Sequence, residues 1–565
     1  MAKVISIGNQ SFESIREKDN FYIDKTNFIR EWWDNDDTVT LITRPRRFGK
    51  TLNMSMLECF FSNKYKDRGD LFEGLKIWND EKYRKLQGTY PVIFLSFAEI
   101  KQNNYNDAVE KIKRIICEVC QQFDFLKNWD GLTEIEKKNI SNISYNMSDV
   151  MAQDLIKNMS NYLSRYYGKK VIILLDEYDT PMQEAYVNGY WEELVAFTRS
   201  LFNSTFKTNP YLERAIMTGI TRVSKESIFS DLNNLKVITV TSDEYSKCFG
   251  FTEDEVFAAL DEQGLSSEKE KVKLWYDGFT FGDEKDVYNP WSIINFLDEK
   301  KYKTYWADSS SNGLVNELIR TGSAEIKKTM ETLIAGGTVE KNIDEQIVFE
   351  QLKTNKDAVW SLLLASGYLR VETFRTEGRL NKKIYSLKLT NYEVEQMFGT
   401  MIERWFGGAD VPYNEFINAM LNGDIESMNE YMNRVTRGVI SYFDTGKTPS
   451  DEEPERFYHG LVLGLMVEQV DNYILNSNRE SGYGRYDIML EPIDKTNEKY
   501  PGIVIEFKVI NPRKENTLEE TVAAALKQIE EKNYDAELVK RGVKEENIHH
   551  YGFAFRGKEV LIDGR

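Results

Sequence analysis

The stretch that most constrains the fold is residues 39–51, VTLITRPRRFGKT. Its first five residues are all apolar or β-branched and predict a short buried strand. A loop follows that ends in Gly49, Lys50 and Thr51, and an apolar pattern with helical spacing begins at Leu52. A strand, a loop ending in Gly-Lys-Thr and a helix are together typical of a phosphate-binding P-loop. The stretch therefore predicts an α/β domain that binds a nucleotide.

Each residue at the end of this loop has a specific expected role. Gly49 lets the backbone turn so that N–H groups face a phosphate, and the helix N-terminus adds a favourable dipole. We expect Lys50 to reach the β- and γ-phosphates of ATP, and the Thr51 hydroxyl to ligate Mg²⁺. ATP and Mg²⁺ are therefore the expected cofactors.

The loop departs from the P-loop pattern at one position. The pattern G-x-x-x-x-G-K-[ST] requires glycine where this chain has Arg44. A basic surface loop therefore remains an alternative interpretation. Arg46 and Arg47 crowd the same loop, and Arg47 is the candidate nucleotide contact among them. Arg44, Arg46 and Arg47 all have the same two alternatives: they either bind phosphate or pair with acids on a neighbouring element.

Composition limits the class of protein. The chain has 565 residues, which predicts roughly three to four domains. The sequence lacks an apolar run of about 18 residues and an apolar signal segment at its start, so we expect a cytoplasmic protein without a membrane span. The net charge of −18 argues against a broad basic surface but leaves room for a local basic groove. Cys117 and Cys120 form a C-x-x-C inside a helical pattern and are expected to be buried thiols.

A second chemical motif lies in residues 170–180, KVIILLDEYDT. Five apolar residues in a row predict a buried parallel strand that ends at Asp176 and Glu177. In an ATPase the aspartate holds Mg²⁺ and the glutamate orients or deprotonates the attacking water. The alternative is an acidic cap on the helix that follows the strand.

Residues 214–221 and 237–241 predict further buried strands. The first ends near Thr218, which is placed to sense a γ-phosphate, and Arg222 follows closely. Arg222 either supplies positive charge to the nucleotide or forms a surface ion pair. Because strands and helices alternate at this spacing, we expect a parallel sheet with helices on both faces.

The middle of the chain offers fewer chemical signals. The aromatic stretches WYDGFTFG and VYNPWSIINFL predict a helical lid that packs onto the nucleotide domain. Residues 358–391 predict a helix and two strands, which suggests a winged-helix-like module that either binds DNA or serves as a structural spacer. Residues 444–454, DTGKTPSDEEP, have the composition of a linker.

Beyond that linker, two predicted strands carry a charged constellation. Asp487 lies on the first strand, and Glu506 and Lys508 alternate across Phe507 on the second, so that both point to one face. Two acids can hold a divalent cation, and a lysine can activate water and stabilise charge on a scissile phosphate. The alternative is a charged, solvated sheet face. Three polar residues of the next helical pattern and its end are candidates to support the site: Lys527, Gln528 and Tyr534.

The chain resembles the AAA-ATPase-like family fused to a C-terminal nuclease of the PD-(D/E)xK superfamily. The residues that carry the resemblance are YIDKT, RPRRFGKT, LLDEYD, TGITRVSKESIFSDLNNL, WYDGFTFG, VYNPWSI, FYHG, SNRESGYGRYD, EFK, ALKQI and GFAF. In this family the P-loop sequence is usually RPRRFGKT, which lacks the first glycine of the general pattern. The resemblance implies an ASCE-type P-loop ATPase sheet with a helical lid and a winged-helix-like middle region, followed by an α/β domain of restriction-endonuclease-like fold.

The resemblance also assigns roles at the second site. It implies Asp487 and Glu506 as metal ligands and Lys508 as the catalytic lysine. Tyr486 stands where the superfamily's name has proline, a common substitution, and Gln528 resembles a helix glutamine of some subgroups. Many of these nucleases use a further acid on the first core helix, for which Glu455 is the nearest match.

We therefore expect four parts: an ATPase domain at 1–250, a lid at 251–330, a connector at 331–445 and a nuclease-like domain at 446–565. The expected function is ATP-regulated, Mg²⁺-dependent cleavage of nucleic acid, DNA rather than RNA, with homo-oligomers formed through the ATPase domain. By analogy with the family, a role in mobile elements or phage defence fits this chemistry. The rival hypothesis is a nucleotide-dependent switch or scaffold whose nuclease-like domain binds a partner without cutting.

Overall fold

The structure is a computed structural model. It describes residues 3–222, 228–229, 232–307, 315, 318–319, 324–334, 336–344, 358–378, 382–406, 414–439, 472–477, 480–481, 484–497, 499–511, 515–556 and 559–565. The chain forms two compact units, one made of residues 1–310 and 340–393 and the other of residues 311–339 and 394–565. The division into four domains stays a prediction.

The first unit is built around a five-stranded parallel sheet in the order β2-β3-β4-β1-β5. Its strands are β1 (Val39–Thr43), β2 (Val92–Ser96), β3 (Val171–Asp176), β4 (Leu212–Gly219) and β5 (Leu235–Ile238). Strands β1 and β3 are buried along their whole length, as expected for a sheet covered on both faces. The parallel α/β fold predicted for this part of the chain is confirmed.

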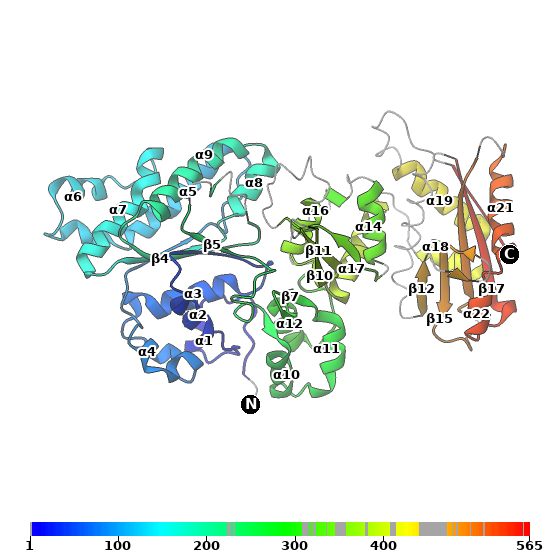
Figure 1. The fold of residues 1–565 in the computed structure, drawn as a ribbon, viewed down its shortest axis with the longest axis horizontal. Helices are drawn as coiled ribbons and strands as arrows, with labels where there is room; N and C mark the ends of the chain where they lie inside the picture. Colours follow the sequence, from blue (N-terminus) through cyan, green and yellow to red (C-terminus); the bar gives the residue numbers. More distant parts are fainter. Residues whose placement is uncertain are drawn as a thin grey trace. The chain divides into compact units, whose positions relative to one another are not determined.

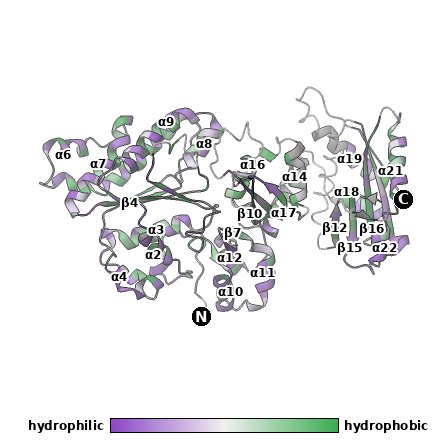
Figure 2. Ribbon diagram, in the orientation of Figure 1, coloured by the Kyte–Doolittle hydropathy of each residue, from purple (hydrophilic) through white to green (hydrophobic). Residues whose placement is uncertain are grey.

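Helices cover both faces of this sheet (Figure 1). They are α1 (Phe12–Glu17), α2 (Asn27–Asn35), α3 (Lys50–Phe61), α4 (Glu81–Arg84), α5 (Tyr105–Gln121), α6 (Glu134–Ser141), α7 (Asp149–Tyr167), α8 (Thr180–Asn188) and α9 (Trp191–Phe202). Helices α1 to α4 lie on one side and α5, α7 and α9 on the other (Figure 1). Helices such as α7 carry both hydrophilic and hydrophobic residues, as an amphipathic surface helix does (Figure 2).

The parallel strands end at one edge of the sheet, and this edge positions the candidate site. Thr43 at the end of β1 pairs with Gly219 at the end of β4, and Asp176 at the end of β3 pairs with Ser96. Helix α3 starts directly after Gly49, whose backbone has a φ of 78°. Glycine adopts this left-handed conformation without strain, so the chain turns sharply from β1 into α3.

The remainder of the first unit folds as smaller sheets and helices. Residues 251–307 contain β6 (Phe251–Thr252), α10 (Glu253–Glu262), α11 (Lys269–Tyr276), β7 (Phe279–Phe281), β8 (Glu284–Tyr288) and α12 (Pro290–Glu299). After them come β9 (Val339–Lys341), α16 (Ala358–Ala365), β10 (Leu369–Glu377) and β11 (Lys382–Leu389), whereas α14 (Ala324–Ile334), which precedes β9, belongs to the second unit. The predicted helix, strand, strand order of residues 358–391 is confirmed.

The second unit contains a mixed five-stranded sheet in the order β12-β15-β16-β17-β18. Its elements are α17 (Tyr392–Phe406), α18 (Asn414–Asn422), α19 (Ile425–Val439), β12 (Tyr473–Ser477), β13 (Glu480–Ser481), β14 (Gly484–Arg485), β15 (Ile488–Pro492), β16 (Gly502–Val509), α21 (Leu518–Lys532), α22 (Ala536–Lys540), β17 (Ile548–Arg556) and β18 (Glu559–Gly564). Strand β16 pairs antiparallel with β15 and parallel with β17. A mixed sheet of this kind with a packed helix is consistent with a restriction-endonuclease-like fold.

The two faces of this second sheet differ. Ile503, Ile505 and Phe507 of β16 pack on residues of α18 and α19. Val504, from the alternate positions, packs with residues of α21 and with Tyr534. Because side chains alternate along a strand, Glu506 and Lys508 lie on the face of Val504, next to α21.

Two further predictions concern the whole chain. All four cysteines are buried and free, as predicted. Among the residues that the structure describes, every helix is too short or too polar to span a lipid bilayer.

Candidate functional site

The ends of β1, β3 and β4 bring together polar side chains that lie far apart in the sequence. The Thr51 hydroxyl donates to one oxygen of Asp176 over 2.7 Å, and the Thr218 hydroxyl donates to the other over 2.5 Å. Asp176 is fully buried. Its burial, and the negative charge of Glu177 beside it, raise the pKa of the Asp176 carboxyl. The expected ligands of Mg²⁺, a carboxylate and a hydroxyl, therefore lie in direct contact.

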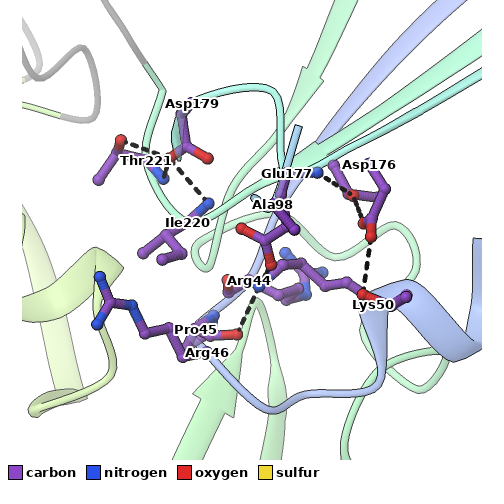
Figure 3. A network of polar contacts seen from close by, with 12 residues as sticks. Arg44, Pro45, Arg46, Lys50, Ala98, Asp176, Glu177, Asp179, Ile220 and Thr221 are labelled. Carbon is purple, nitrogen blue, oxygen red and sulfur yellow. Dashed lines mark hydrogen bonds and ion pairs between the residues drawn. The ribbon is translucent and has the colours of Figure 1, made fainter. Parts of the chain in front are cut away.

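Lys50 is drawn into the same cluster (Figure 3). Its ammonium group lies 3.3 Å from a carboxylate oxygen of Glu177, although only 3% of the residue is exposed. It also donates to the carbonyl oxygens of Arg44, at 3.2 Å, and Pro45, at 3.0 Å. The lysine therefore folds back on its own loop, and a bound phosphate would replace these partners.

Glu177 has a backbone conformation that glutamate rarely adopts. Its φ is 53°, in the left-handed region. Its N–H donates to the Thr218 hydroxyl over 3.4 Å. Strained backbone at a polar cluster is held in place by the surrounding structure and is often found where a side chain must be aimed. The strand-and-acid motif is thus joined to the P-loop rather than serving only as a helix cap.

Two other predicted nucleotide contacts lie outside this cluster. The guanidinium of Arg47 lies 4.1 Å from the ring centre of Trp291 in α12, and the residue is exposed. Arg222 follows β4 and lines a small cavity together with Thr43 and Thr239. Its Nε is buried and has no hydrogen-bond partner within the described residues.

Asp179 is a buried acid that sequence reasoning did not select. One of its oxygens accepts from the N–H groups of Ile220 and Thr221 and from the Thr221 hydroxyl, over 2.9–3.0 Å (Figure 3). These bonds fix the backbone between Thr218 and Arg222. The signal was the second aspartate of LLDEYD, an acid directly after a strand that already ends in two acids.

The second candidate site lies on β15 and β16. Ile488 pairs with Ile505 and Met489 with Val504 in the antiparallel register. The pairing ends at Ile488 and Ile505, and Asp487 directly precedes β15. Glu506 and Lys508 share one face of β16. Asp487 lies beside the same strand, because its carboxylate contacts the backbone of Phe507.

Hydrogen bonds connect these residues through helix α21. The Phe507 N–H donates to a carboxylate oxygen of Asp487 over 2.8 Å. Lys508 donates to the amide oxygen of Gln528 over 2.7 Å, and the amide nitrogen of Gln528 donates to Glu506. Gln528 thus bridges the lysine and the buried acid.

Tyr534 reports on the position of both acids. Its hydroxyl accepts from Gln528 over 3.2 Å, and the residue is 1% exposed. Burial raises the pKa of Tyr534, and the negative charges of Glu506 and Asp487 raise it further. Tyr534 and Glu506 both contact the amide nitrogen of Gln528, so the tyrosine hydroxyl lies next to the buried acid.

The donor chemistry of this face suits a hard divalent cation, which prefers carboxylate oxygens. Glu506 is 4% exposed, while Asp487 and Lys508 are half-buried. A cluster of at least three histidine, cysteine or acidic residues, which would mark a complete protein cage, is not found within the described ranges. Asp487 and Glu506 are the residues of this site that would hold such an ion.

Three described residues near the second site in the sequence have other partners, and one predicted residue lies outside the described part of the chain. Lys527 is exposed and pairs with Glu531 over 3.4 Å. His549 contacts Tyr551, and His550 contacts Asp535, in agreement with ordinary strand positions. Glu455 lies outside the described residues.

Comparisons with known proteins agree with this division into two sites. Residues 6–229 match the family model of a predicted AAA-ATPase, and residues 453–564 match the model of the PD-(D/E)XK nuclease superfamily. A protein from Azotobacter chroococcum mcd 1, described as an uncharacterized protein in the vnfD 5′ region, is 25% identical over 396 residues. The match covers 70% of this chain and 68% of that protein.

Proposed function

We propose that this chain, which joins an AAA-ATPase-like domain to a PD-(D/E)XK nuclease superfamily domain, is an ATP-regulated, Mg²⁺-dependent phosphodiesterase that acts on DNA. ATP binding in the first unit would change the conformation or oligomeric state of the protein. That change would control access to Asp487, Glu506 and Lys508 in the second unit.

The nucleotide half rests on the cluster around Asp176. Lys50 would exchange its two carbonyl partners for the β- and γ-phosphates, and Thr51 and Asp176 would hold Mg²⁺ between them. Glu177 would accept a proton from the attacking water or orient it, because its carboxylate is already directed at the phosphate side of the loop by the ion pair with Lys50.

The nuclease half rests on Glu506 and Lys508 of β16 and on Asp487, which directly precedes β15 and contacts the backbone of β16. Asp487 and Glu506 would hold Mg²⁺, which when bound supplies Lewis acidity at the scissile phosphate. Lys508 would stabilise the negative charge that develops on phosphorus oxygens during attack by water. Gln528 would keep the Lys508 ammonium directed at the substrate side of the sheet, since it holds this group at 2.7 Å.

One observation carries the proposal. Each unit contains its own acid-plus-lysine cluster: Lys50 with Asp176 and Glu177 where β3 ends and α3 begins, and Lys508 with Glu506 on β16. Burying such groups is unfavourable unless they pair or bind a ligand. Two independent clusters of this type in one chain favour two phosphate-binding chemistries.

The nucleotide half can be tested by titrating the full-length protein with a fluorescent ATP analogue. Wild type should bind in the presence of Mg²⁺, and Lys50→Ala should lose binding. Lys82→Ala is the matched control, because Lys82 pairs on the surface with Asp34. Equal binding by wild type and Lys50→Ala would remove the nucleotide site from the proposal.

The nuclease half can be tested with plasmid DNA, single-stranded DNA and single-stranded RNA, with and without ATP and Mg²⁺. We expect metal-dependent cleavage of DNA by wild type, and none by Lys508→Ala. Lys527→Ala should cleave normally, because Lys527 lies next to Gln528 in the sequence of α21 but is exposed and pairs with Glu531. Faster cleavage of RNA than of DNA would make RNA, and not DNA, the proposed substrate.

A second candidate function is a nucleotide-dependent switch or scaffold with a non-cleaving nuclease-like domain. The closed chain of contacts from Lys508 through Gln528 to Glu506 favours it, because these groups already satisfy one another. The net charge of −18 also favours it over broad nucleic-acid binding. Binding of Mn²⁺ to the protein without cleavage of any nucleic acid would support this function instead.

A further inference from the structure

Arg44 occupies the position where the P-loop pattern has glycine, yet it is fully buried. Its guanidinium donates to the carbonyl oxygen of Thr43 over 2.9 Å and to that of Thr239 over 2.7 Å. Longer contacts reach the carbonyl oxygens of Glu244, at 3.4 Å, and Tyr245, at 3.5 Å. The side chain therefore ties the end of β1 to the segment that follows β5.

The guanidinium is held without a carboxylate partner in the part of the chain that the structure describes. Aromatic rings flank it instead, Phe281 at 4.5 Å and Phe249 at 5.8 Å from ring centre to guanidinium carbon. Burial lowers the pKa of Arg44 to about 10, so the group stays charged at neutral pH. Carbonyl dipoles and aromatic faces are the partners that a planar guanidinium accepts where an ammonium does less well.

The backbone of Arg44 lies at the centre of the nucleotide cluster. Its N–H donates to the carbonyl oxygen of Gly219 at the end of β4, over 3.1 Å. Its carbonyl oxygen accepts from the Lys50 ammonium over 3.2 Å. Any movement of Arg44 would therefore shift Lys50 and change the spacing between β1 and the end of β4.

The rest of the loop is fixed by the same surroundings. The indole N–H of Trp306 donates to the carbonyl oxygen of Arg46 over 3.0 Å. Phe48 packs edge-on against Phe279, with ring centres 4.7 Å apart. A loop held by side chains at several points needs no glycine flexibility at its start.

From these contacts we infer that Arg44 is a positioning residue for nucleotide binding and not a phosphate ligand. Its buried guanidinium sets the shape of the loop that a glycine sets in the general pattern. This inference rests on the proposed function, because it assumes that ATP binds at Lys50 and Thr51. The general P-loop pattern suggests that glycine at residue 44 would improve ATP binding. This inference predicts the opposite, that Arg44→Gly weakens ATP binding.

The test is the affinity of the full-length protein for a fluorescent ATP analogue with Mg²⁺. Arg44→Gly should weaken binding roughly tenfold or more, because charged donors are lost and buried carbonyl oxygens are left without partners. Arg44→Lys should also weaken it, because one ammonium nitrogen cannot replace two guanidinium nitrogens, of which one bonds Thr43 and Thr239 and the other contacts Glu244 and Tyr245. If Arg44→Gly fails to fold, the Arg44→Lys titration decides the question.

Arg214 provides a matched control. It is also a buried arginine that donates to two carbonyl oxygens, those of Trp32 and Trp33, and it lies 4.0 Å from the Trp33 ring. It stands near the start of β4, at the opposite end of the strand from Gly219. Arg214→Gly should lower the melting temperature as Arg44→Gly does, but the folded protein should bind ATP as wild type does.

A chemical rescue separates positioning from general stability. Methylguanidinium at low millimolar concentration should restore ATP binding to Arg44→Gly, whereas methylammonium at the same concentration should not. Wild-type affinity in Arg44→Gly would overturn the inference and leave the proposed function intact. Equal loss of affinity in Arg44→Gly and Arg214→Gly would also overturn it. Absence of ATP binding by wild type would instead remove the proposed function.

Discussion

The two candidate sites hold their charged groups in different ways. Around the P-loop, the groups contact one another directly: Lys50 meets Glu177, and Thr51 meets Asp176. In the second unit, the contacts run through an intermediary, because Gln528 stands between Lys508 and Glu506. The first site is also more deeply buried, with Lys50 and Asp176 at 3% and 0% exposure.

This difference has a chemical consequence. Direct contacts mean that a ligand at the P-loop must take over partners that the protein already uses, so binding and local rearrangement are linked. A bridging amide leaves the lysine and the acid in place when substrate arrives. We therefore expect conformational change to begin at the first site and chemistry on nucleic acid to occur at the second.

The largest effect is expected at Glu506. Glu506→Gln should reduce the cleavage rate roughly a thousandfold, because a metal-holding carboxylate is lost. Glu491→Gln is the matched control: Glu491 is buried on the neighbouring strand but pairs with Arg541 and Lys495. The rates would be compared on plasmid DNA with Mg²⁺. Similar rates for the two variants would contradict the assignment of the second site.

A smaller effect is expected at Thr51. Thr51→Val should lower the gain in ATP affinity that Mg²⁺ provides by roughly tenfold, with little change in metal-free binding. Thr40→Val is the control, since Thr40 is buried in β1 and its hydroxyl has no hydrogen-bond partner within the described residues. Titration of a fluorescent ATP analogue with and without Mg²⁺ measures the difference. An unchanged Mg²⁺ effect in Thr51→Val would argue against a metal at Asp176.

Gln528 tests the bridging arrangement itself. Gln528→Leu should reduce cleavage by about 10- to 100-fold, as loss of a residue that orients a ligand or a lysine does. Glu531→Gln on the same helix should leave the rate unchanged, because Glu531 pairs only with exposed Lys527 among the described residues. Full activity of Gln528→Leu would mean that cleavage does not need an amide between Lys508 and Glu506.

The smallest effect concerns an acid pair away from both clusters. Burial, together with the charge of Asp286, raises the pKa of Asp277 from 3.8 to about 7. The folded protein therefore favours the protonated carboxyl, and this contribution to stability is complete below about pH 4 and lost as pH rises through 7.

Asp277→Asn should therefore raise the melting temperature by a few degrees at pH 8 and have little effect at pH 4. Thermal melts of wild type and variant across this range measure the difference. A constant difference at every pH would contradict the shifted pKa. Neither the P-loop cluster nor the second site should respond, which separates the stability of the region around Asp277 from both chemistries.

Local patterns in the sequence predicted much of the fold. Residues 39–43 form β1 with the predicted bounds, and the strand before Asp176 and the strand that carries Glu506 and Lys508 are present. These predictions succeeded because long apolar runs and period-2 alternation are local signals. β5 was expected at 237–241 but is Leu235–Ile238. The Thr239 N–H donates to the Ser242 hydroxyl rather than to a neighbouring strand, so the chain turns away from the sheet.

The long-range contacts of the site could not be read from local patterns. From the sequence we expected Arg44 to bind either a phosphate or an acidic side chain. Its hydrogen-bond partners are instead carbonyl oxygens that include one almost 200 residues away, that of Thr239. Asp179 likewise acts on residues that follow β4. Such partners depend on which strands become neighbours, and a single sequence shows the ends of strands but not their order.

The most direct test of the whole account is the ATP dependence of cleavage. The cleavage rate of plasmid DNA would be measured for wild type and for Lys50→Ala, with Mg²⁺ and with or without ATP. The account predicts that ATP changes the wild-type rate and leaves the Lys50→Ala rate unchanged. A wild-type rate that is the same with and without ATP would contradict the coupling between the two units.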